Sequence, residues 1–147
     1  MFCMEFENIN EEAFSDLEKP RKTRNTPESD VIQKIGKERV TSLKNFILEL
    51  NILIEEREKL SRMITSEVEK IKMEVDNFLK NNTSFDADGF RERNGLRLKQ
   101  IEVSELELNE KVNCWRDVAL LKKELRERQK ELSEKQERVS MFDQILK

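Results

Sequence analysis

The sequence has 147 residues, of which 40% are charged and 36% hydrophobic, with three glycines, two prolines and no histidine. Few helix breakers among periodic Leu, Ile, Glu and Lys are typical of long helices and coiled coils, and they exclude disorder throughout the chain. The net charge of −3 excludes a polycation, and the lack of histidine removes the commonest general base and metal ligand. We therefore expect an all-α protein that is not an enzyme and binds no metal or cofactor.

Residues 1–25 are predicted to form a mobile segment that is first acidic and then basic. Its first 18 residues include Glu and Asp but no Lys or Arg. Phe6, Ile9, Ala13 and Leu17 are spaced so that they would share one face of a helix. Two interpretations stay open for this segment: a helix that docks through Phe6, Ile9 and Leu17 in a groove, or a solubilising terminus.

A basic cluster follows the acidic part, and it consists of Lys19, Arg21, Lys22 and Arg24. Such a cluster is typical either of a nuclear import signal or of a patch that contacts phosphate. Thr26 precedes a proline, which makes it a candidate phosphorylation site at the start of a helix. The alternative for Thr26 is a helix N-cap without modification.

The first long helix is predicted over residues 26–80. Pro27 suits the first helical position, and Glu28 and Asp30 suit the positive end of the helix dipole. Apolar residues recur at three positions per heptad, which favours the face of a helical bundle over a two-stranded seam. The candidate interface residues of this helix are Leu43, Phe46, Leu50, Leu53, Leu60, Ile64, Ile71 and Phe78.

Residues 81–89 are predicted to form a loop because Asn, Thr, Ser, Asp and Gly cluster there. The stretch "DADGF" resembles part of a calcium-binding loop, but Gly95 stands where such a loop needs a bidentate carboxylate. A turn with a helix cap is therefore favoured. The second helix is predicted over residues 90–147, and the dipeptide Asn94-Gly95 makes Leu96 an alternative start.

The second helix carries two apolar series with different registers. The first consists of Ile101, Leu108 and Trp115, and the second of Val118, Leu125, Leu132 and Val139. The step between them predicts a register shift near residues 115–118. Trp115 is predicted to fill a core layer of a bundle at this shift, and the alternative is an anchor that faces a partner.

The two cysteines and the chain start bear on localisation. Cys3 and Cys114 lie far apart without a metal or redox spacing, which favours free thiols in a reducing compartment. The start "MFCMEFENIN" lacks the features of a signal peptide, and no apolar run is long enough to span a membrane. We expect a nuclear or cytoplasmic protein that is not secreted or inserted in a membrane.

The two predicted helices either form an antiparallel hairpin or each run beside separate partner helices. Two helices do not fully bury a three-position stripe on each other, so further helical subunits are expected. A hetero-oligomer is favoured over a homo-oligomer because a dedicated two-stranded coil would keep one constant seam. We expect a structural subunit of an elongated complex of the kinetochore, spindle, tethering or chromatin type. The alternative is an accessory factor of DNA recombination or repair that contacts phosphate through residues 19–24.

Overall fold

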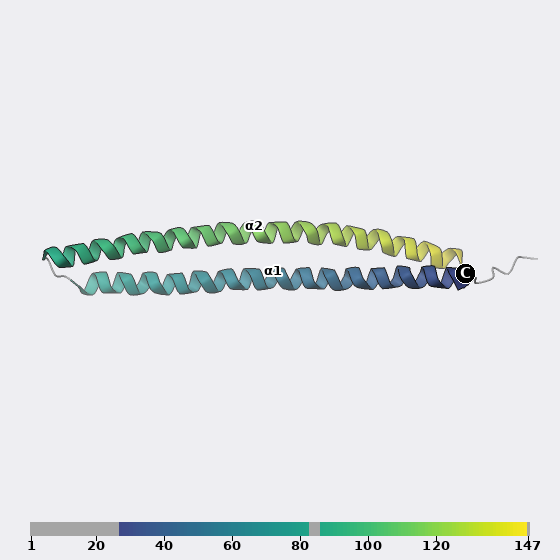
Figure 1. Ribbon diagram of the computed structural model, residues 1–147, viewed down its shortest axis with the longest axis horizontal. Helices are drawn as coiled ribbons and strands as arrows, with labels where there is room; N and C mark the ends of the chain where they lie inside the picture. The colour runs from purple at the N-terminus through teal and green to yellow at the C-terminus, as the bar shows by residue number, and fades with distance from the viewer. Residues whose placement is uncertain (1–26, 83–85, 147) are drawn as a thin grey trace, which may run out of the picture.

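The computed structural model describes residues 27–82 and 86–146 of the chain. Two helices, α1 (Pro27–Asn81) and α2 (Ala87–Ile145), pack against each other as an antiparallel hairpin (Figure 1). At about 1.5 Å per residue, each helix is roughly 80–90 Å long. The part of the chain that the structure describes contains no strand, which confirms the all-α class.

Helix α1 begins at Pro27, where the missing N–H leaves no helical hydrogen bond unmade. Glu28 and Asp30 lie in its first turn and Lys80 lies in its last turn, so each end carries the charge that complements the helix dipole. Gly36 does not interrupt the helix. It faces α2, and a Cβ atom at this position would lie 3.4 Å from Cγ2 of Val139.

Helix α2 begins at Ala87, which is earlier than either predicted start. Asp86 has extended backbone angles, with φ −76° and ψ 167°, and its Oδ1 accepts a hydrogen bond of 2.9 Å from the backbone N–H of Gly89. This cap satisfies one of the free amides at the helix end. Asn94 and Gly95 lie inside the helix, and the expected irregularity at this dipeptide is absent. One interior glycine costs only about 1 kcal/mol, which a long packed helix accommodates.

Contacts along the whole hairpin fix its register. Residues early in α1 meet residues late in α2, and the pairs run in reverse order toward the loop: Gly36 with Val139, Phe46 with Arg128, Arg57 with Asp117, Lys72 with Glu107, and Asp76 with Gln100. Figure 1 shows that α2 bows with its convex side away from α1. This is the usual sense of curvature for a helix with one solvated face.

The buried interior of the hairpin is small. Leu50, Ile54 and Val118 are the buried apolar residues of the described ranges, and they are 3%, 7% and 8% exposed. Large apolar side chains remain exposed along both helices. Two helices therefore bury a narrow strip of side chains between them, and much of each apolar stripe stays uncovered.

Candidate functional site

The half of the hairpin opposite the loop, where α1 begins and α2 ends, has an apolar seam. We call this part, residues 27–56 of α1 with 118–146 of α2, the terminal half. Buried Leu50, Ile54 and Val118 mark its inner limit. The half-buried side chains that continue the seam outward are Val40, Leu43, Ile47, Leu121, Leu125, Leu132 and Val139. Here one row of apolar side chains on each helix faces the other helix.

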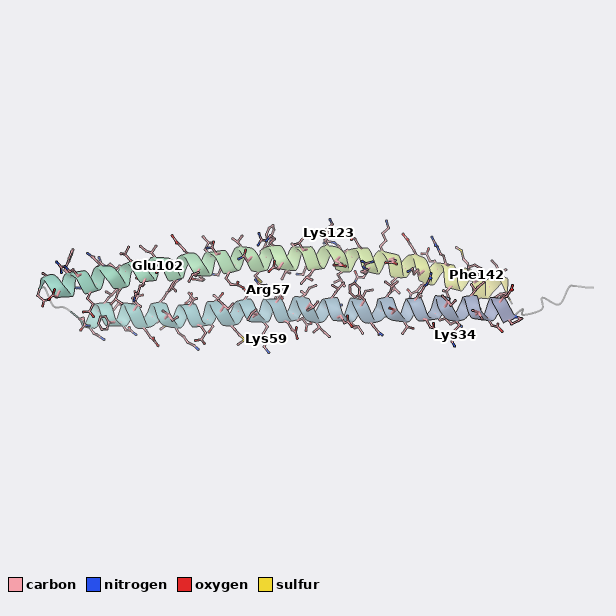
Figure 2. All side chains as sticks on the ribbon, viewed as in Figure 1. Lys34, Arg57, Lys59, Glu102, Lys123 and Phe142 are labelled. Atoms are coloured by element: carbon pink, nitrogen blue, oxygen red, sulfur yellow. The ribbon has the colours of Figure 1, made fainter. Side chains whose placement is uncertain are left out.

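The remaining part, residues 57–81 of α1 with 87–117 of α2, is the loop half. Its seam combines charged and polar residues with half-buried apolar ones, which are Ile64, Val68, Val75, Leu79, Leu96 and Val103. Arg57 lies between the helices (Figure 2) and pairs through Nη1 with Glu110 at 2.6 Å and through Nε with Asp117 at 3.0 Å. The carboxylates of Glu110 and Asp117 raise the pKa of Arg57 above its ordinary value. The Sγ of half-buried Cys114 lies 3.9 Å from the carbonyl oxygen of Arg57.

A second polar group of the loop half surrounds Glu107, which is 7% exposed. Its carboxylate accepts hydrogen bonds from Lys111 on the same helix and from Lys72 on α1. These two ammonium groups, Lys111 first, lower the pKa of Glu107 to about 2. Closer to the loop, Gln100 Nε2 donates to Asp76 Oδ1 at 2.7 Å. The seam of the loop half therefore adds ion pairs between the helices to its half-buried apolar residues, whereas the buried apolar residues of the described hairpin lie in the terminal half.

In the loop half, half-buried Leu96 and Val103 of α2 lie on the same face as the polar residues that meet α1, but a second row of apolar residues lies on the opposite side. We define the outer stripe as Leu98, Ile101, Leu108, Val112 and Trp115, which are 55–76% exposed. Their spacings of three, four and seven place them along one face of the helix. Residues on the other face, including Gln100, Glu107 and Cys114, are the less exposed ones. The outer stripe is an apolar surface with no neighbour in the described hairpin.

Helix α1 also carries candidate residues that lie outside the seam. Leu53, Leu60, Ile71 and Phe78 are exposed, from 40% for Phe78 to 51% for Leu60. Phe46 is 37% exposed, and the guanidinium of Arg128 lies 5.5 Å from its ring centre. The remaining candidates face the other helix: Leu43, Leu50, Ile64, Val118, Leu125, Leu132 and Val139.

Arg128 is held over Phe46 by carboxylates of its own helix. Its guanidinium pairs with Glu131 at 3.1 Å and with Glu124 at 3.4 Å, and these two groups raise the pKa of Arg128. Lys135 lies 2.6 Å from Glu131 and, together with Arg128, lowers the pKa of that carboxyl. A chain of alternating charge therefore borders the apolar seam of the terminal half.

The structure changes the interpretation of Trp115. The sequence predicts a core layer, but the side chain is 76% exposed and lies outside the seam. Near the predicted register shift, the less exposed residues of α2 change in character. They are polar before it, at Glu110 and Asp117, and apolar after it, at Val118 and Leu125. Sequence reasoning missed Leu98 as a member of the outer stripe and Arg57 as a seam residue. The spacing of Leu98 from Ile101 was a visible signal, whereas the pairing of Arg57 with residues of the other helix was not.

Several predicted sites lie outside the described residues, and they stay predictions. They are the docking residues Phe6, Ile9 and Leu17, the basic patch Lys19, Arg21, Lys22 and Arg24, the phosphorylation candidate Thr26, and the thiol Cys3. Within residues 27–82 and 86–146 there is no cluster of three His, Cys, Asp or Glu side chains with the geometry to hold a metal ion. Neither helix there is long and apolar enough to cross a membrane.

Comparisons of the chain with protein-family models, with curated protein sequences and with solved structures find no match. The function proposed below therefore depends on the surfaces of the hairpin itself.

Proposed function

We propose that the chain is a non-enzymatic structural subunit that assembles through its helices with other helical proteins into an elongated complex. A scaffold of the kinetochore, spindle, tethering or chromatin type fits this architecture. The observation that carries the proposal is the outer stripe. Contiguous apolar surface on a protein marks a site of interaction more often than an isolated exposed residue does.

The outer stripe has the form of a surface for another helix. Leu98, Ile101, Leu108, Val112 and Trp115 follow the alternating three- and four-residue spacing that lets side chains of one helix pack between those of a neighbour. Glu105 is the polar residue in the same row, and such a polar position specifies alignment in helical assemblies. Trp115, at the end of the row, has the side chain most favoured as an interface anchor.

The exposed residues of α1 support the same proposal. Leu53, Leu60, Ile71 and Phe78 are partly exposed beside the seam. A third helix laid along this side would cover them, and a helix on the outer stripe would cover α2. We propose different helical subunits as these neighbours. The apolar residues of the two surfaces have different registers, and a homo-oligomer would more simply assemble through a single apolar surface.

The proposal is tested by placing a photo-cross-linking amino acid at position 108 of the full chain in cells. Cross-linked peptides identified by mass spectrometry are expected to come from a helical segment with apolar residues at three- and four-residue spacing. Leu108→Asp with Trp115→Asp should weaken binding to the identified subunit by about 30-fold, which corresponds to loss of about 2 kcal/mol at an interface anchor.

Asn109→Asp with Asn113→Asp is the matched control, because it adds the same negative charge at exposed positions of α2 outside the stripe. This control should leave both binding and helical content unchanged. If the Leu108 and Trp115 variant keeps its partners, or if the unmodified chain is a stable helical monomer without partners by light scattering, the proposal is wrong.

A further inference from the structure

The end of the hairpin opposite the loop contains an apolar groove with a basic rim. It has a volume of about 470 Å³ and lies between the first turns of α1 and the last turns of α2. Its apolar lining comes from Ile32, Ile35, Val139, Phe142, Ile145 and Leu146. Ile32, Phe142 and Ile145 are more than half exposed, so this lining is open to solvent on the described hairpin.

The charged side chains that line the groove are all basic. Arg39, Lys135 and Arg138 line it, and no Asp or Glu does. Lys135 is paired with Glu131. Within the described ranges, neither Arg39 nor Arg138 has an ion-pair partner. The groove therefore suits an occupant that combines an apolar face with carboxylates.

Gly36 contributes depth to this groove. It lines the floor and carries no side chain, and α2 approaches here closely enough that a Cβ atom would meet Val139 at 3.4 Å. A larger residue at position 36 would fill part of the space that an inserted side chain needs.

We propose that residues 5–18 of the same chain occupy this groove as an amphipathic helix, with Phe6, Ile9, Ala13 and Leu17 against its apolar floor. These residues share one helical face by their spacing. The acidic residues of the segment, which has no Lys or Arg, complement the basic rim: Glu5, Glu7, Glu11, Glu12, Asp16 and Glu18. A helix that lays its apolar face in a groove is a recurrent mode of recognition.

The connection to α1 permits this docking within one chain. Nine residues lie between Leu17 and Pro27, where α1 begins, and the ten Cα–Cα steps span at most about 35 Å when extended. The part of the groove on α1, Ser29 to Arg39, extends only about 15 Å along the helix. A short connection of this kind gives the segment an effective concentration of about 1 mM or more, so even a weak contact is well populated. This inference does not rest on the proposed assembly function.

Cys3 provides a reporter for the test, because it lies close to Phe6 in the sequence. A nitroxide is attached to Cys3 in the full chain carrying Cys114→Ser, and its effect on methyl signals is measured by NMR. The signals of Ile35, Val139 and Ile145 are expected to broaden, whereas those of Ile71 and Val103 in the loop half should not. Absence of broadening at the groove, or equal broadening in both halves, would overturn the proposal.

Two pairs of substitutions test the role of charge. Arg39→Glu with Arg138→Glu should abolish the selective broadening at the groove. Lys59→Glu with Lys123→Glu makes the same charge change on the outer sides of α1 and α2 (Figure 2) and should leave it intact. Broadening that survives reversal of the rim charges contradicts the proposal.

Phe6→Ser with Ile9→Ser adds a variant outside the hairpin, so it tests the contact even if the rim variant fails to fold. It should also abolish the selective broadening, and persistence of the effect contradicts docking through this face. A final experiment mixes two preparations of the chain. One carries the isotope label but no nitroxide, and the other carries the nitroxide but no isotope label. Broadening at the groove in this mixture would show that a second copy supplies the segment, which overturns docking within one chain.

Discussion

The two halves of the hairpin hold their helices together in different ways. In the terminal half, Leu50 and Ile54 of α1 are buried near Val118 of α2. In the loop half, Arg57 and Lys72 reach across to Glu110, Asp117 and Glu107, while Leu108 and Trp115 point away from α1. The buried apolar residues of the described hairpin thus lie in the terminal half, whereas the loop half carries ion pairs between its helices and exposed apolar residues on the outer side of α2.

This difference indicates which apolar surface of the hairpin is available for burial against a partner. Apolar burial contributes about 25 cal/mol per Å² removed from water, and Leu50, Ile54 and Val118 provide the deepest apolar burial of the described hairpin in its terminal half. Ion pairs that remain partly exposed contribute much less to stability. The loop half therefore keeps its most apolar surface for a neighbour, and its own two helices are joined by weaker interactions.

The largest effect that tests this comparison is expected from Leu50→Ala. Leu50 is 3% exposed, and its truncation should lower the free energy of unfolding by about 2–4 kcal/mol, through lost burial and the cavity left behind. Leu108→Ala, at a 63% exposed position, should change it by no more than about 0.5 kcal/mol. Urea unfolding followed by circular dichroism measures both. Equal losses of unfolding free energy in the two variants would mean that the two halves do not differ in how they bury apolar residues.

A smaller effect is expected from Glu107→Gln, and it should depend on pH. The folded pKa of Glu107 is about 2, below the ordinary 4.5, so its ionised form stabilises the fold above about pH 4.5. That contribution is lost as the pH falls from about 4.5 toward 2. The urea midpoints of the variant and the unmodified chain should therefore differ at neutral pH and converge near pH 2.

Glu102→Gln is the control for this comparison, because it removes the same charge from an exposed position of α2 (Figure 2). Its midpoints should follow those of the unmodified chain across the pH range. Midpoints for Glu107→Gln that stay parallel to those of the unmodified chain down to pH 2 would contradict the role assigned to this carboxylate.

The smallest effect is expected from Gly95→Ala, and it is stabilising. Gly95 lies inside α2, and a Cβ atom added there would meet no atom within 4 Å, so alanine should add about 0.5–1 kcal/mol through its helix preference. Gly36→Ala in the terminal half should gain less, because its methyl group meets Val139. Thermal unfolding compares the two variants. A destabilised Gly95→Ala would show that α2 is not helical at this position in solution.

The helices themselves could be predicted from local chemistry. Pro27 with Glu28 and Asp30 marks the start of α1, and the periodic apolar residues indicate the helical class of the whole chain. The predicted start of α2 at residue 90 is too late because it assigns all of the loop-forming residues 81–89 to the loop, and the alternative start at Leu96 gives too much weight to Asn94-Gly95. The cap at Asp86 satisfies a backbone amide directly, whereas the two unfavourable residues add only a modest cost inside a packed helix.

The rotation of α2 about its own axis could not be predicted from spacing alone. The series of Ile101, Leu108 and Trp115 predicts an apolar stripe, but a stripe does not state which neighbour it faces. In the structure, Arg57 pairs with Glu110 and Lys72 with Glu107, and these contacts join residues far apart in the sequence. They turn the polar face of α2 toward α1, so Trp115 lies on the outside.

The antiparallel arrangement also determines how the hairpin responds to force. Pro27 and Ile145 lie at the same end, so tension applied across that end would load the seam one layer at a time, in an unzipping geometry (Figure 1). Tension applied between Pro27 and the loop would instead run along α1 itself and would leave the seam largely unloaded. Unzipping meets the apolar layers around Leu50 before the ionic layers around Arg57, so the stronger half resists first and the weaker half then opens with little further force.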